Sequence, residues 1–215
     1  MAMRISTVFK EVASFDALKP ETITPILCTM KTSYSLSDHF LVAMPSLADP
    51  IFAHSVTYVC QHTEEGAVGL IVNKPLNLTL SDVFSQMEIE AQGSNFILPI
   101  MEGGPVHQER GFVIHSPRYQ WRSTVDTSKK LAITTSKDIL LALAKDEGPD
   151  EVLVSLGYCG WEAGQLEAEI AKNYWLTTPA DSDIIFHVPF AERWEKAAGL
   201  IGVDLAMLSA EVGHA

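Results

Sequence analysis

The stretch that decides the fold is residues 39–75, HFLVAMPSLADPIFAHSVTYVCQHTEEGAVGLIVNKP. It contains three short apolar runs: FLVAM, which stops at Pro45, SVTYVC, which is β-branched and aromatic, and GAVGLIVNKP, which stops at Pro75. Such runs between turn residues indicate β-strands. The Asp-Pro of SLADPIF and the glycines of HTEEGAVG supply the turns between them. The stretch therefore predicts three consecutive strands, and it carries no complete catalytic or cofactor motif.

The rest of the chain alternates strand and helix patterns. Strand character is found in NFILPIM (95–101), GFVIHS (111–116), LAITT (131–135) and EVLVSLGY (151–158). Helices are predicted in LTLSDVFSQMEIE (78–90), KDILLALAK after a cap at Thr135 or Ser136, AGQLEAEIAKN (163–173), PFAERWEKAAGLIG (189–202) and DLAMLS (204–209). These elements predict a mixed α/β (α+β) fold, in which helices cover a mixed, largely antiparallel sheet or partial barrel.

Four motifs occur along the chain in a fixed order. They are NKP (73–75), GGPV (103–106), HSP (115–117) and GWEAGQLEAE (160–169). Together they resemble the YqgE/AlgH family of bacterial proteins over roughly residues 36–215. The resemblance implies a single YqgE/AlgH-like domain over residues 35–215 and a link to transcriptional regulation, which is how the family has been labelled. It implies no active site that could be transferred residue by residue.

Composition narrows the class of protein further. With 215 residues and 47% hydrophobic content, the chain can bury one good core. Its net charge of −12 and its 15 basic residues argue against direct nucleic-acid binding, which depends on Lys and Arg neutralising phosphates. No apolar run approaches the length of a membrane helix, and the three cysteines fit a reducing compartment. The sequence thus predicts an acidic, soluble, cytoplasmic protein.

Residues 1–34 are predicted to be a dispensable extension. The family-like pattern begins near Ser35, and Met30 is a candidate native start. Upstream, Val8 and Phe15 belong to only a weak helical stripe. The alternative is that this stripe docks on the domain and regulates it.

Three motifs offer candidate binding residues, each with a simpler structural explanation. Lys74 beside Asn73 could face an anionic ligand, or the pair could only end a strand. Gly103 and Gly104 could expose N–H groups to an anion, or could form a tight turn. His115 could act with the serine that follows it, although adjacent strand residues point to opposite faces, which favours a structural role.

Cys60 is the candidate redox thiol. It is two residues from His62, so both share one face of a strand, but an inert buried cysteine is the simpler interpretation. His54, Cys60 and His62 span too much extended chain to meet on one ion. No metal site and no cofactor are predicted.

The segment GYCGWEAGQLEAEI (157–170) is the strongest candidate binding site. It is predicted to be a strand, a glycine-flanked turn and a helix, with Tyr158, Gly160, Trp161 and Gln165 as candidate contacts. Its glutamates would repel a phosphate, which favours a protein or neutral ligand. The simpler explanation is that Trp161 packs under the helix and that the glycines only let the chain turn.

Two functions follow from these candidates. The leading hypothesis is a non-catalytic regulatory or protein-interaction module that has no catalytic residues and does not bind nucleic acid directly. The sequence does not indicate the oligomeric state. The alternative is a hydrolase-like or nucleotide-binding enzyme, whose pocket would gather residues from the NKP, GGP, HSP and GYCGW segments. These candidates are Asn73, Lys74, Gly103, Gly104, His115 and Trp161. Their convergence in one cavity would favour the enzyme, and their separation would disfavour it.

Overall fold

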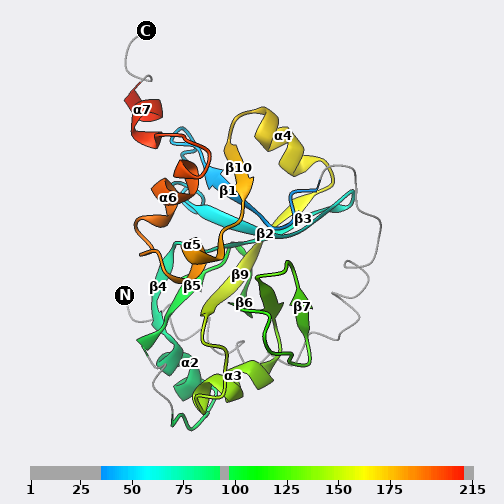
Figure 1. Ribbon diagram of the computed structural model, residues 1–215, viewed down its shortest axis with the longest axis vertical. Helices are drawn as coiled ribbons and strands as arrows, with labels where there is room; N and C mark the ends of the chain where they lie inside the picture. Colours follow the sequence, from blue (N-terminus) through cyan, green and yellow to red (C-terminus); the bar gives the residue numbers. More distant parts are fainter. Residues whose placement is uncertain (1–34, 93–96, 211–215) are drawn as a thin grey trace. The chain divides into compact units, whose positions relative to one another are not determined.

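The computed structural model describes residues 35–92 and 97–210 (Figure 1). The prediction about residues 1–34 lies outside the described residues and stays a prediction. The strands are β1 (His39–Ala43), β2 (Val56–Thr63), β3 (Gly66–Ile71), β4 (Pro75–Thr79), β5 (Pro99–Glu102), β6 (Val106–His115), β7 (Thr124–Asp126), β8 (Ala132–Thr134), β9 (Val152–Glu162) and β10 (Trp175–Pro179). The helices are α2 (Leu80–Gln86), α3 (Lys137–Ala144), α4 (Gln165–Ala171), α5 (Ser182–Phe186), α6 (Arg193–Gly199) and α7 (Leu205–Ala210).

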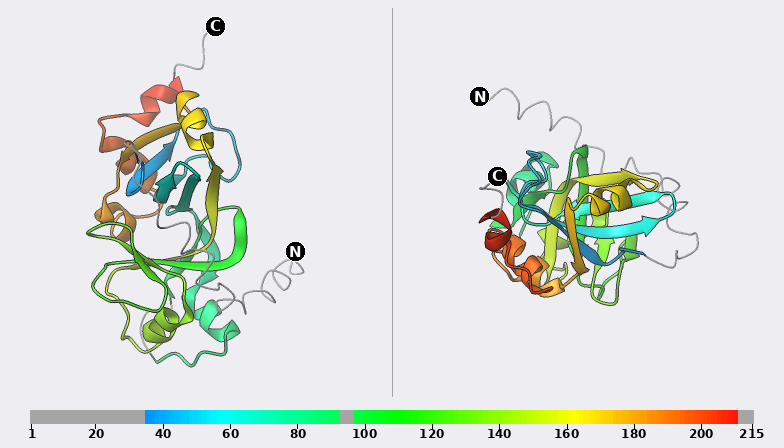
Figure 2. Two further views of the ribbon diagram at one scale, coloured as in Figure 1. Left: turned by 90° about the vertical axis from the view of Figure 1, so that its right-hand side faces the viewer. Right: turned by 90° about the horizontal axis from the view of Figure 1, so that it is seen from above.

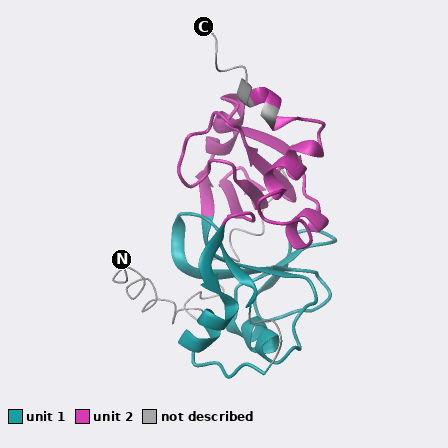
Figure 3. Cartoon of the chain, turned by 90° about the vertical axis from the view of Figure 1, so that its left-hand side faces the viewer, with its two compact units in different colours: residues 1–29, 75–158 teal, residues 30–74, 159–215 magenta. Residues whose placement is uncertain are grey.

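The chain divides by its internal contacts into two compact units (Figure 3). Among the described residues, unit 1 is 75–158, and unit 2 consists of 35–74 and 159–210. Strand β9 contributes its first residues to unit 1 and its last residues to unit 2.

Unit 2 is built on the three strands predicted from residues 39–75. They form the antiparallel order β10-β1-β2-β3, and the end of β9 pairs with β3, with Ala67 opposite Trp161. One face buries the core members Leu41, Val59 and Ile71 against Leu166 of α4. Helices α5 and α6 pack on each other, whereas α4 lies apart from them against β3 and β10 (Figure 2). The three-strand prediction is confirmed.

Unit 1 surrounds the first part of β9. Strand β9 pairs with β5 in parallel and with β6 antiparallel, β6 continues to β8 and β7, and β4 pairs with β5. Helices α2 and α3 supply apolar side chains to its core, among them Leu80, Phe84, Ile139 and Leu143. Because the β5–β9 pair is the one parallel pairing among the described strands, the α+β prediction of a mixed, largely antiparallel sheet with helices is confirmed.

Two helix predictions are confirmed, that of α2 over a shorter range than the predicted 78–90 and that of α3 with its cap. Helix α2 begins at a capping box, in which Asp82 N–H donates to Thr79 Oγ1 and Thr79 N–H donates to Asp82 Oδ2. Helix α3 is preceded by Ser136 as its N-cap, one of the two predicted positions. It ends at Ala144, shortly before Gly148 and Pro149.

Several strand predictions were wrong in extent. The strands β4, β7 and β10 and the helix α5 were not predicted, and β6 begins at Val106, between the strands that were predicted at 95–101 and 111–116. The pairing of β6 with β9 is irregular between Val106 and Gly111, and the intervening residues are polar and partly exposed. A bulged, solvent-facing strand segment has no alternating apolar pattern, so periodicity does not reveal it.

The predicted glycine turn at residues 157–161 was also wrong. Strand β9 runs without interruption from Val152 to Glu162, and its last residues pair with β3. Gly157 adopts a φ of +74° within the strand. A glycine inside a strand often marks close backbone approach instead of a chain reversal.

Within residues 35–92 and 97–210, no helix has both the length and the apolar character needed to cross a bilayer.

Candidate functional site

Asn73 and Lys74 hold the loop that connects β1 to β2. Asn73 Oδ1 accepts from Val56 N–H at 2.8 Å, and Asn73 Nδ2 donates to His54 O at 2.8 Å. Lys74 Nζ donates to Ile51 O at 2.5 Å. The side chains of Asn73 and Lys74 are therefore bound to backbone groups of the same unit, where they stabilise the loop between β1 and β2.

Gly103 and Gly104 lie where β5 approaches β9. Gly103 N–H donates to Leu156 O at 2.7 Å, so it is not presented to a ligand. A Cβ at Gly103 would overlap Gly157 O, and a Cβ at Gly157 would overlap Gly104 O. These glycines permit two backbones to meet, in line with the structural explanation.

His115 is fully buried and belongs to a closed chain of hydrogen bonds. Its Nδ1 donates to Ser116 O at 2.8 Å, so Nε2 of the neutral ring accepts from Thr134 Oγ1 at 2.8 Å. Thr134 in turn accepts from Thr124 Oγ1 at 2.7 Å, and Thr124 accepts from Trp121 N–H at 2.7 Å. Burial lowers the pKa of His115, while the carbonyl of Ser116 opposes that shift. The imidazole is thus a neutral, internally satisfied core group.

Tyr158 is half-buried, and its contacts are with other aromatic rings. Its ring is stacked on His107 with centroids 6.0 Å apart and contacts the edge of Phe112 at 5.8 Å. His107 is exposed, has a φ of +48°, and lies 2.9 Å from Glu109 through Nδ1 and Oε1. We call His107, Phe112 and Tyr158 the aromatic face of unit 1.

Trp161 is buried in the core of unit 2 with 6% of its surface exposed. Its Nε1 donates to Glu169 Oε2 at 2.9 Å, and Trp175 Nε1 donates to the same oxygen at 2.8 Å. Gln165 Nε2 donates to Glu169 Oε1 at 2.9 Å, while Gln165 Oε1 accepts from Glu162 N–H at 3.0 Å. The two indole rings meet edge to face at 6.2 Å. One carboxylate thus ties helix α4 to strands β9 and β10.

Gly160 lies in β9 opposite Val68, with its own position exposed. Helix α4 begins after Gly164, whose φ is +74°, and is seven residues long. The expected arrangement, a helix N-terminus facing the end of a strand across a glycine turn, is therefore absent from this part of the described chain.

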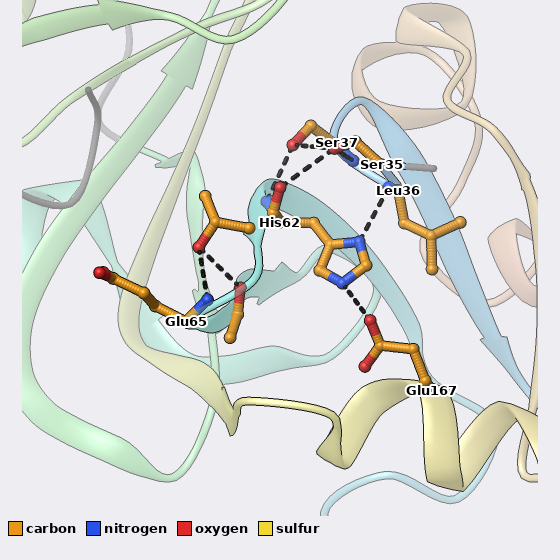
Figure 4. A network of polar contacts seen from close by, with 8 residues as sticks. Ser35, Leu36, Ser37, His62, Glu65 and Glu167 are labelled. Carbon is orange, nitrogen blue, oxygen red and sulfur yellow. Dashed lines mark hydrogen bonds and ion pairs between the residues drawn. The ribbon is translucent and has the colours of Figure 1, made fainter. Parts of the chain in front are cut away.

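A second carboxylate of the same helix binds a buried histidine that sequence reasoning treated only as a neighbour of Cys60. His62 Nε2 lies 2.8 Å from Glu167 Oε1, and His62 Nδ1 accepts from Leu36 N–H at 3.0 Å (Figure 4). His62 N–H donates to Ser37 Oγ at 2.8 Å, and His62 O accepts from Ser35 Oγ at 3.1 Å. The side chain of His62 is 3% exposed, whereas that of Glu167 is 52% exposed. The motif GWEAGQLEAE carries no local signal for this contact, because His62 and Glu167 are 105 positions apart in the chain.

Arg193 is a further buried group that the sequence did not single out. It is 3% exposed, its Nε donates to Val188 O at 2.9 Å, and its Nη1 donates to Val72 O. The guanidinium lies over the ring of Phe190, 4.4 Å from the centroid. Burial lowers its pKa to about 10. A cation held by carbonyls and an aromatic ring fastens α6 to the end of β3.

Cys60 lies at an irregularity in β2, between Val59 and Gln61, and is half-buried. Burial raises the pKa of its thiol, with a smaller contribution from Cys159, and its Sγ donates to Tyr58 O at 3.7 Å. A raised pKa leaves little thiolate at neutral pH, and the thiolate is the reactive form. Among the residues that the structure describes, no group of three or more His, Cys, Asp or Glu side chains is arranged to hold a metal ion.

The candidate residues therefore serve separate contacts. Asn73, Lys74 and Trp161 belong to unit 2, and Gly103, Gly104 and His115 belong to unit 1. Within unit 1, His115 lies opposite Val152 near the start of β9, while Gly103 approaches Gly157. The enzyme alternative, which required these residues to line one pocket, is not favoured.

Comparison with known proteins decides the family. A family model described as AlgH-like matches residues 40–206. This chain belongs to the AlgH-like family. The matched range includes all four motifs and confirms the resemblance that they indicated.

Relatives of this AlgH-like protein carry the name UPF0301. One from Thioalkalivibrio sulfidiphilus is 52% identical over 186 residues, which cover 86% of this chain and 100% of that protein. Another from Saccharophagus degradans is 50% identical over 181 residues, which cover 84% of this chain and 89% of that protein.

Two solved structures share the fold. The solution structure of AlgH from Pseudomonas aeruginosa is 46% identical, with a TM-score of 0.70, and the match covers 87% of this chain and 100% of that chain. A crystal structure of a protein from Corynebacterium diphtheriae is 19% identical, with a TM-score of 0.64 over 86% of this chain and 96% of that one. The second likeness shows the fold alone.

Proposed function

We propose that this AlgH-like protein is a non-catalytic regulatory and protein-interaction module that acts in the cytoplasm. The observation that carries the proposal is that the motif side chains are engaged in internal contacts, while the aromatic face of unit 1 stays accessible. Asn73, Lys74, His115, Trp161 and Gln165 each bind groups of their own unit. None of these residues is free to act as an activated nucleophile or a general base.

The aromatic face has the chemistry of a recognition patch. Tyr158 and His107 present stacked rings beside Phe112, and aromatic side chains are enriched where proteins bind one another. The cytoplasmic assignment is supported by Cys60, which is a free thiol.

Any effect on transcription is assigned to a protein partner. With 15 basic residues against 27 acidic ones, the chain lacks the positive charge that binding to DNA phosphates needs. We expect no specific duplex binding at about 150 mM salt. Fluorescence anisotropy with labelled duplexes and excess competitor DNA checks this, and tight binding that survives the competitor would contradict it.

The proposal is tested by purifying the tagged full-length protein from its own cells and identifying the co-eluting proteins by mass spectrometry. Tyr158→Ala is expected to lose a specific partner, because it removes the central ring of the aromatic face. Tyr119→Ala is the matched control, since Tyr119 is an exposed tyrosine of the same unit and its ring centroid lies 5.9 Å from that of Trp121. A partner retained by the Tyr158 variant, or the absence of any specific partner, would contradict the proposal.

A further inference from the structure

The polar network around His62 lies where the described chain begins. The stretch 35–37 precedes β1 and is held to β2 through the main chain and the imidazole of His62. The side chain of Leu36 is buried in the core of unit 2, with 2% exposed. The imidazole of His62 therefore helps to hold residues 35–37 against β2 (Figure 4).

The hydrogen bonds determine the proton positions on the imidazole. A backbone N–H can only donate, so His62 Nδ1 must be an acceptor toward Leu36. The ring proton then resides on Nε2, where it is donated to Glu167 Oε1 at 2.8 Å. This arrangement requires a neutral ring, because a protonated imidazole has donors at both nitrogens and no acceptor for Leu36 N–H.

We propose that His62 and Glu167 form a pH-sensitive latch on residues 35–37. When the ring takes up a proton at Nδ1, the bond from Leu36 N–H is lost and two N–H groups face each other. The bond to Glu167 persists as an ion pair at the other nitrogen. Protonation thus removes the imidazole's contact with Leu36 and turns its bond to Glu167 into an ion pair, so that residues 35–37 are held less firmly, by the bonds of Ser35 and Ser37 and the buried Leu36 side chain.

The charged surroundings of His62 are compatible with this exchange. The ion pair that the described contacts place on His62 is with Glu167 of α4. The other neighbours, Ser35, Leu36 and Ser37 on one side and Ala67 opposite in β3, carry no charge. Glu65, in the turn between β2 and β3, is exposed and uses its N–H to donate to Thr63 Oγ1. A proton on His62 is therefore balanced by one half-exposed carboxylate.

The test follows the Leu36 amide in the full-length protein by hydrogen exchange, expressed as a protection factor to remove the intrinsic effect of pH. Between about pH 7.5 and about pH 5, where histidine ordinarily changes charge, protection at Leu36 is expected to fall by about tenfold or more. The ring of His62 is followed by NMR in the same samples. The latch would be overturned if the ring stayed neutral over this range, or if it titrated while Leu36 protection stayed constant.

Two variants distinguish the acceptor role of Nδ1 from the donor role of Nε2. His62→Asn keeps an acceptor near the position of Nδ1 without a titrating group, so protection at Leu36 should no longer depend on pH. His62→Gln keeps a donor near Nε2 but has no acceptor for Leu36, so protection should be low throughout. His187→Asn is the control, because His187 is an exposed histidine whose Nδ1 lies 3.0 Å from Asp183 Oδ1. The same pH dependence in His62→Asn as in the unmodified protein would overturn the latch, and the NMR titration decides the matter if a variant does not fold.

Discussion

Strand β9 is held in two different ways along its length, and the comparison shows how each unit is stabilised. In unit 1, β9 meets its neighbours through backbone groups that approach closely at Gly103 and Gly157. In unit 2, the same strand also pairs closely with β3, at Gly66, but a side-chain network is added, in which the indole of Trp161 binds Glu169. A backbone fit tolerates no added atoms, whereas a side-chain network tolerates no lost partner.

The buried histidines follow the same division. His115 of unit 1 is enclosed by carbonyl and hydroxyl partners, whereas His62 of unit 2 contacts a carboxylate that is half in solvent. A closed neutral chain resists protonation, while a ring in contact with a carboxylate has an ionic alternative. The four predictions that follow use these contrasts.

The largest effect is expected from removing Trp161. Trp161→Ala should lower the free energy of unfolding by about 3–5 kcal/mol, because it leaves a cavity and removes a donor from Glu169. Urea denaturation measures this change. Trp161→Phe, which keeps most of the ring volume, should cost clearly less, and equal costs for both variants would show that the indole N–H dominates. A loss below about 1 kcal/mol for the alanine variant would contradict the assignment of Trp161 to the core.

A comparison of Gly157 with Gly164 separates the cost of a steric clash from the cost of the left-handed conformation, because both residues have a φ of +74°. A Cβ at Gly157 would overlap Gly104 O, while a Cβ at Gly164 meets nothing within 4 Å. Gly164→Ala should cost about 1–2 kcal/mol for the left-handed conformation alone. Gly157→Ala should cost about 1–3 kcal/mol more, through the added clash. Thermal or urea unfolding of the two variants measures the difference, and equal losses would show that the backbone at Gly104 can move away from β9 freely.

His115 should make stability depend on pH. Its pKa is lowered by burial, so the unfolded chain binds a proton before the native state does as the pH falls. Its contribution is therefore complete above about pH 6.5 and is lost as the pH falls below that value, with a slope of up to about 1.4 kcal/mol per pH unit.

The measurement is urea unfolding between about pH 7.5 and about pH 5 for the unmodified protein, His115→Gln and the exposed-site control His187→Gln. The slope should be smaller in His115→Gln and unchanged in the control. A slope that survives in His115→Gln would assign the pH dependence to another group.

The last prediction concerns the chemical reactivity of Cys60 and not stability. Because burial raises the pKa of this thiol, iodoacetamide at neutral pH should modify it much more slowly in the native protein than in urea. Mass spectrometry of the modified peptide measures the two rates. Similar rates would revive the redox-thiol prediction, which otherwise has no support from the surroundings of Cys60.

Much of the architecture was predictable from local pattern. The apolar runs of residues 39–75 identified β1, β2 and β3, and the cap predicted at Thr135 or Ser136 identified the start of α3. The four motifs identified the AlgH-like family. These features depend on short stretches of sequence, because the alternation of apolar and polar residues, turn residues and helix caps act on neighbouring positions.

The tertiary structure decided what the motif residues do. Gly157 was read as part of a turn because local sequence cannot distinguish a reversal from a close approach by β5. The partners of Glu167 and Glu169 lie on other strands, so no helical pattern could reveal that one binds His62 and the other binds Trp161 and Trp175. Sequence alone determined which elements form, because propensity and patterning are local. Only the fold decided which polar groups meet, because those contacts join residues that are distant in the chain and become close only when the strands pair.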